Sequence, residues 1–75
     1  MAISDKIKAL MKIKGKDNAA LAEYLEMSKQ ALSNKFYRES FSGVDLIKIA
    51  DFLGCDLAFV IDNAQKINLE ISDIK

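Results

Sequence analysis

Apolar residues recur at two different spacings along this chain. Up to Leu53 they lie three and four residues apart, the spacing of an amphipathic helix. From Leu57 onward apolar and polar residues alternate, as in a half-exposed strand. The predicted elements are helices over residues 4–14, 18–26, 28–37 and 43–53, and strands over residues 57–62 and 67–73. The fold class is therefore mainly α, with four helices followed by a C-terminal β-hairpin.

The ends of the predicted helices carry capping residues. Asp17, Ser28 and Ser42 precede the second, third and fourth helices, where a side-chain oxygen accepts hydrogen bonds from free backbone N–H groups. Ser4 suits the start of the first helix, and Gly54 ends the fourth. Only a short turn is left between the second and third helices.

The second and third helices have the residue pattern of a helix-turn-helix. Two helices that cross steeply across a three-residue turn need a small residue at their contact, and Ala22 supplies it. Leu21, Leu25, Met27 and Leu32 fill the space below. A generic helical hairpin would show a similar pattern.

The third helix carries polar side chains on its outward positions. Gln30 and Asn34 each present an acceptor beside a donor, which matches adenine N7 and N6 in the major groove. Lys29 reaches guanine O6/N7 or a phosphate. The predicted base-contacting residues are Lys29, Gln30, Ser33 and Asn34.

A second set of residues is expected to contact DNA phosphates. It consists of Asn18, Ser28, Lys35, Tyr37 and Arg38. Free backbone N–H groups at the start of the third helix favour an anion beside Ser28. For Asn18 the alternative role is a helix cap, and for Lys35 and Arg38 it is ordinary solvated surface.

The charge distribution favours a polyanionic partner, although the net charge is zero. Residues 1–38 hold eight Lys or Arg against four Asp or Glu, and residues 39–75 hold three against seven. The basic half contains the helix-turn-helix. Lys6, Lys8, Lys12 and Lys14 cover the surface of the first helix. Seventy-five residues make one domain, 1–75, with a core so small that a second copy would add to it.

The composition excludes several classes of function. The chain has no His and a single Cys, Cys55, so a disulfide framework and a Cys/His zinc site are excluded, and no cofactor is expected. Without His or a Gly-rich phosphate loop there is little from which to build a catalytic site, so we expect no enzyme. No apolar run is long enough to span a membrane and no signal peptide is recognised, which predicts a cytoplasmic protein.

Two stretches resemble a known family. The sequence LAEYLEMSKQALSNK, residues 21–35, resembles the helix-turn-helix core of the phage repressor and Cro family of xenobiotic-response-element-like regulators. The sequence SGVDLIKIADFLGCDL, residues 42–57, resembles that family's next helix with its IA..LG segment. The resemblance implies a cytoplasmic bacterial or phage transcription regulator that binds a palindromic operator as a dimer. By position it implies a phosphate contact for Asn18 and base contacts for Lys29, Gln30, Ser33 and Asn34.

The chain departs from the family pattern at three places. Glu26 stands in the turn where the family has Gly, and a left-handed conformation there costs roughly 1–2 kcal/mol. Lys35 stands where the family has an apolar residue, and we expect Phe36 to fill the core instead. A hairpin replaces the fifth helix of many members, and Cro-like members of the family dimerise through such C-terminal strands.

The hairpin is therefore the predicted homodimer interface, with candidate residues Phe52, Phe59, Ile67, Leu69 and Ile71. Pairing of two identical strand edges gives a two-fold contact and removes an exposed edge. The alternative is an antitoxin-type or other protein-interaction module whose C-terminal half binds a different protein. A neighbouring toxin gene or a co-purifying second chain would favour that alternative.

Overall fold

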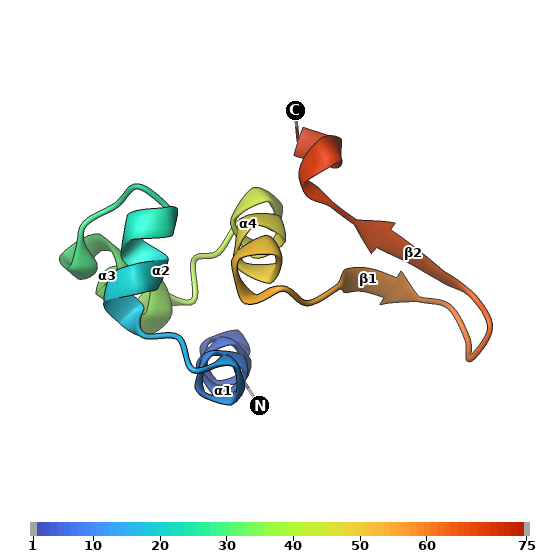
Figure 1. Cartoon of the computed structure of the whole chain (residues 1–75), viewed down its shortest axis with the longest axis horizontal. Helices are drawn as coiled ribbons and strands as arrows, with labels where there is room; N and C mark the ends of the chain where they lie inside the picture. Colours follow the sequence, from blue (N-terminus) through green and yellow to red (C-terminus); the bar gives the residue numbers. More distant parts are fainter. Residues whose placement is uncertain (1, 75) are drawn as a thin grey trace.

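The structure is a computed structural model that describes residues 2–74, and it contains four helices followed by a hairpin (Figure 1). The prediction of this fold class is confirmed. The helices are α1 (Ile3–Lys14), α2 (Asn18–Tyr24), α3 (Lys29–Arg38) and α4 (Gly43–Leu53). The antiparallel strands are β1 (Leu57–Val60) and β2 (Lys66–Leu69), and the short 3-10 helix η1 (Ile71–Ile74) follows them.

The strands are shorter than predicted, because local side-chain bonds compete with the ladder at both ends. In the hairpin turn, Asp62 Oδ1 accepts hydrogen bonds from the N–H groups of Ala64 and Gln65, at 2.8 and 2.9 Å. After β2, the Asp73 carboxylate accepts from the Glu70 N–H at 2.7 Å and winds the chain into η1. Ile71 was therefore wrongly assigned to a strand.

Helix α2 ends two residues before the predicted boundary. Leu25 is its C-cap, and Glu26 adopts the left-handed conformation with a φ of 57°. The Met27 N–H then donates to the Ala22 carbonyl at 3.0 Å, which closes the turn. This φ lies in the left-handed region that favours Gly, which is consistent with the expectation that Glu26 occupies the position where the family has Gly. Glu26 therefore bears the backbone strain that a Gly would avoid.

Helix α1 begins differently from the prediction. Its N-cap is Ala2, which makes no side-chain capping bond, and Ser4 is buried inside the first turn. The Ser4 hydroxyl donates to the Phe36 carbonyl at 2.6 Å, and its N–H donates to the Glu39 carboxylate at 3.1 Å. Ser4 thus joins the start of α1 to the end of α3.

One hydrophobic core holds the four helices together. Its buried members are Ile7, Met11, Leu21, Ala22, Leu32, Phe36, Ile49 and Leu53. Ala22, which is 3% exposed, allows α2 and α3 to approach closely, as the pattern predicts. Leu10 has the helical spacing of Ile7 and Met11 but is 37% exposed at the rim of the core.

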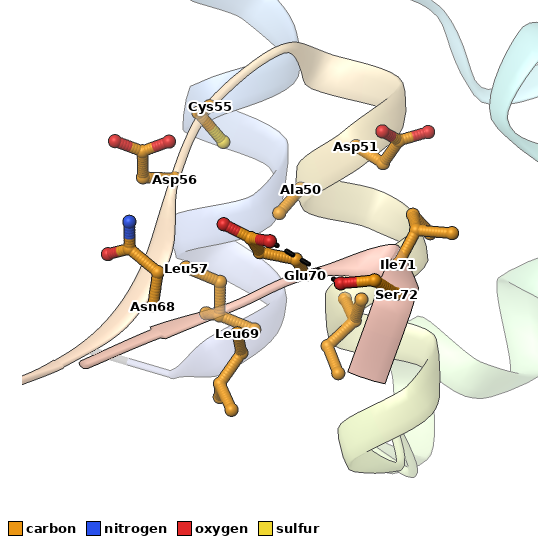
Figure 2. Close-up of a pocket in the computed structure, with 11 residues that line it drawn as sticks. Ala50, Asp51, Cys55, Asp56, Leu57, Asn68, Leu69, Glu70, Ile71 and Ser72 are labelled. Atoms are coloured by element: carbon orange, nitrogen blue, oxygen red, sulfur yellow. Dashed lines mark hydrogen bonds between the residues drawn. The ribbon is translucent and has the colours of Figure 1, made fainter. Parts of the chain in front are cut away.

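The hairpin projects away from the helices, on the opposite side of α4 from α2 and α3 (Figure 1). Leu57 pairs with Leu69 near α4, and Phe59 pairs with Ile67 farther out. The first pair is half-buried and lines a hollow against α4 (Figure 2), whereas the second pair is exposed. Ile47, which lies off the main apolar stripe of α4, is buried at this junction.

Candidate nucleic-acid interface

Helix α3 presents its polar residues because its apolar residues anchor it from below. Leu32 and Phe36 are buried, and the Ser28 hydroxyl caps the helix by accepting from the Ala31 N–H at 3.0 Å. The opposite face is exposed to solvent and carries the four residues predicted to contact bases: Lys29, Gln30, Ser33 and Asn34.

Gln30 and Asn34 lie one turn apart and are hydrogen-bonded to each other. The Gln30 Nε2 donates to Asn34 Oδ1 at 3.3 Å. The remaining Gln30 acceptor and the Asn34 amide donors stay available on an exposed surface. The pair therefore presents acceptor and donor groups side by side in a restrained orientation, which is the chemistry that recognises an adenine edge.

The residues predicted to contact phosphates flank this face. Asp17, not Asn18, caps α2, since its Oδ1 accepts from the Ala20 N–H at 2.8 Å, and Asn18 is exposed at the first position of the helix. Tyr37 is 89% exposed, and Arg38 is exposed at the last position of α3. Ser28 is exposed, although its oxygen already serves as the cap of α3.

Lys35 is engaged within the chain. Its Nζ lies 3.0 Å from Asp45 Oδ2 and donates more weakly to the Ser40 carbonyl at 3.4 Å. Asp45 also completes a capping box with Ser42 at the start of α4. Lys35 therefore links the end of α3 to the start of α4, and a phosphate would have to compete with Asp45 for it.

This arrangement alters the acidity of Asp45. Partial burial raises the pKa of its carboxyl, but the hydrogen bond from the Ser42 N–H and the hydrogen bond and charge of Lys35 together outweigh that effect. The net result is a pKa below the ordinary value of 3.8. The link between α3 and α4 is thus strongest when the carboxyl is ionised.

Lys8 is a cation that lies beside the polar face of α3, although it is not among the residues predicted to contact DNA. Its Nζ lies 5.1 Å from the centre of the Phe36 ring, over the face that α1 approaches. Lysines occur all around α1, so the sequence offers no signal for the one that lies next to α3.

Phe52, a predicted dimer residue, makes contacts within the chain. Its ring lies 5.2 Å from that of Tyr24, and the Lys16 Nζ lies 5.5 Å from its centre. The Tyr24 hydroxyl donates to the Asp51 carboxylate, and this hydrogen bond, with burial and the charge of Asp51, raises the pKa of Tyr24 above 10.0. Phe52 helps to join α2 to α4 and is only half-buried.

The hollow between α4 and the hairpin does not have the chemistry of a DNA site. Asp51, Asp56 and Glu70 contribute to its lining, and these carboxylates disfavour a phosphate (Figure 2). Within residues 2–74, no cluster of His, Cys, Asp or Glu has the arrangement of a metal site. Within the same residues, no helix is long and apolar enough to cross a membrane.

A comparison with models of protein families agrees with this geometry. Neither the curated proteins nor the solved structures provide a match to the chain. The family model described as the bacteriophage CI repressor helix-turn-helix domain matches residues 5–64, from the first turn of α1 to the hairpin turn. Proteins of this family are DNA-binding regulators and not enzymes. Because the match covers most of the chain, the protein belongs to the bacteriophage CI repressor helix-turn-helix family, and DNA-binding transcription regulation is its class of function.

Proposed function

We propose that this protein binds a specific site in double-stranded DNA as a cytoplasmic regulator and reads the major groove with α3. The observation that carries the proposal is the exposed polar face of α3, held outward by the buried Leu32 and Phe36. An α-helix fits the major groove, where each base pair presents a distinct pattern of donors and acceptors.

The proposed contacts fall into two groups. Lys29, Gln30, Ser33 and Asn34 contact base edges, and the restrained Gln30–Asn34 pair contributes most of the sequence preference. Asn18, Ser28, Tyr37 and Arg38 contact the flanking backbone and set the position of α3 in the groove. Lys35 joins that second group only by leaving Asp45.

A gel-shift experiment with the DNA upstream of the protein's own gene tests this function. Selection of bound sites from random DNA supplies a target if that region does not bind. Gln30→Ala should reduce the preference for the selected site over random DNA, by an amount that corresponds to about 1–3 kcal/mol. Arg38→Ala should weaken specific and random DNA alike. Equal losses on both DNAs for Gln30→Ala would exclude its base-reading role.

We also propose that the hairpin forms a homodimer. The exposed fractions of Phe59, Val60, Ile61 and Ile67 are 67%, 73%, 61% and 59%, on a segment that projects from the body of the protein. A two-stranded sheet also leaves one unpaired edge on each strand. Leu69 and Ile71 are half-buried against the body, so the outer part of the hairpin, and not η1, is the favoured contact.

The shape of the chain restricts this dimer. Its longest dimension is 39 Å, and α3 and the hairpin lie toward opposite ends of that axis (Figure 1). The two half-sites of a palindromic DNA site lie about 34 Å apart when they are separated by one DNA turn, and a multiple of that distance apart when they are separated by more turns. The two hairpins must therefore overlap extensively for adjacent half-sites, whereas contact only at their tips would suit sites two turns apart.

Sedimentation equilibrium tests the dimer. Phe59→Lys should shift the wild-type dimer toward monomer, because it buries a charge at the centre of the interface. Ile13→Lys is the matched control, since Ile13 is 76% exposed on α1 and should leave the association unchanged. A wild-type chain that is monomeric at all concentrations would contradict the homodimer, and would direct attention to a different protein as the partner of the hairpin.

A further inference from the structure

A hollow beside α3 brings together hydrogen-bond donors from three helices. The donors are Lys8 of α1, Asn18 of α2, and Ser33 and Tyr37 of α3, and Phe36 also lines the hollow. Its volume is 220 Å³, many times the about 10–15 Å³ that a single water requires. A phosphodiester group with part of its hydration shell fits such a space.

The lining chemistry matches a singly charged anion. It offers an ammonium, a side-chain amide and two hydroxyl groups as donors, and none of the residues that line it is acidic. The Lys8 Nζ lies 5.1 Å from the centre of the buried Phe36 ring. Contact with the ring orients the ammonium without neutralising it, because an aromatic face carries no net charge.

The position of the hollow indicates which anion it would bind. Ser33 and Tyr37 lie one turn apart on α3 and border both the hollow and the exposed face that carries Gln30 and Asn34. A helix seated in the major groove has the DNA backbone on each side of it. An anion in the hollow would therefore be adjacent to base edges contacted by α3.

We propose that this hollow binds one backbone phosphate of the DNA and that Lys8 supplies its cation. This inference rests on the proposed function of α3. It assigns a role to α1, which thereby fixes the angle at which α3 lies in the groove. Phe36 of α3 belongs to the same core as the buried residues of α1, and Lys8 lies over its ring. The position of Lys8 therefore depends on correct packing of α1 against α3.

The salt dependence of DNA binding by the full chain tests the proposal. Lys8→Met keeps most of the side-chain volume over Phe36 and removes the charge. For each bound copy it should make the slope of log affinity against log salt shallower by about 0.9, so that a tenfold rise in salt weakens binding by the variant about eightfold less than binding by the wild type. This change should be equal for specific and random DNA. Lys8→Arg should retain the wild-type slope.

Lys6→Met is the control, because Lys6 is on the same helix but lines a separate apolar hollow against α4. A Lys8→Met slope equal to those of the wild type and Lys6→Met would overturn the phosphate site. That result is distinct from failure of the proposed function, in which the wild type itself binds no duplex DNA.

Free inorganic phosphate is the other source of the same chemical group. If the DNA backbone is the ligand, inorganic phosphate should compete with DNA no better than chloride at matched ionic strength. Stronger competition by phosphate, abolished by Lys8→Met, would show that the hollow takes the free anion and would overturn the assignment to DNA.

Discussion

Glu26→Gly should stabilise the protein, although it removes a charged side chain from the helix-turn-helix. Glu26 has a φ of 57°, and a left-handed conformation costs a non-glycine residue roughly 1–2 kcal/mol. Glycine relieves that strain, but its greater freedom in the unfolded chain offsets about 0.4–1 kcal/mol of the gain. The expected net effect is a free energy of unfolding higher by about 0.5–1 kcal/mol, or a Tm higher by about 2–8 °C.

Glu39→Gly is the matched comparison. Glu39 has nearly the same backbone conformation, with a φ of 54°, so glycine relieves nearly the same strain. However, the Glu39 carboxylate accepts a hydrogen bond from the Ser4 N–H at 3.1 Å. Loss of this hydrogen bond should lower the free energy of unfolding by about 1.5 kcal/mol. Glu39→Gly should therefore leave stability unchanged or lower it.

Urea denaturation followed by circular dichroism, at one protein concentration for all variants, measures the difference. Glu26→Ala separates the loss of the carboxylate from the relief of backbone strain, since alanine removes the carboxylate but keeps the strained Cβ. If Glu26→Gly were less stable than the wild type, or if Glu39→Gly gained as much as Glu26→Gly, the reasoning from backbone strain would be refuted.

Three further outcomes are expected. The pKa of Asp45 is lower in the folded protein than in the unfolded chain, so its stabilising contribution is complete above the unfolded pKa and is lost as the pH falls through the folded pKa. Asp45→Asn removes this contribution, and the variant should therefore show a smaller decrease in Tm below about pH 5 than the wild type shows. Ser4→Ala should lower the free energy of unfolding by about 1–3 kcal/mol in urea denaturation, because the Phe36 carbonyl loses its buried donor. Ala22→Leu should lower the same quantity by about 1–3 kcal/mol or prevent folding, because this position lies in the core where α2 and α3 meet, and a Tm equal to that of the wild type would contradict the close packing.

The sequence by itself determined the elements and the face that α3 presents. Helical spacing placed Leu32 and Phe36 inward, and this alone leaves Lys29, Gln30 and Asn34 outward. The caps at Asp17, Ser28 and Ser42 were also predictable, because a capping bond joins residues three apart in the chain. Such features depend on neighbours in sequence, so a pattern in the sequence is enough to predict them.

Only the tertiary structure decided which polar side chains bond or pack across the fold. Lys35 pairs with Asp45, Ser4 donates to Phe36, and Lys8 lies over the Phe36 ring. In the sequence Lys35 and Lys8 are indistinguishable from ordinary solvated positions on helices, and Ser4 resembles an ordinary helix-start residue. Their roles follow from the angles at which the helices pack, and many distant apolar contacts set those angles together. No periodicity within a single helix records that information.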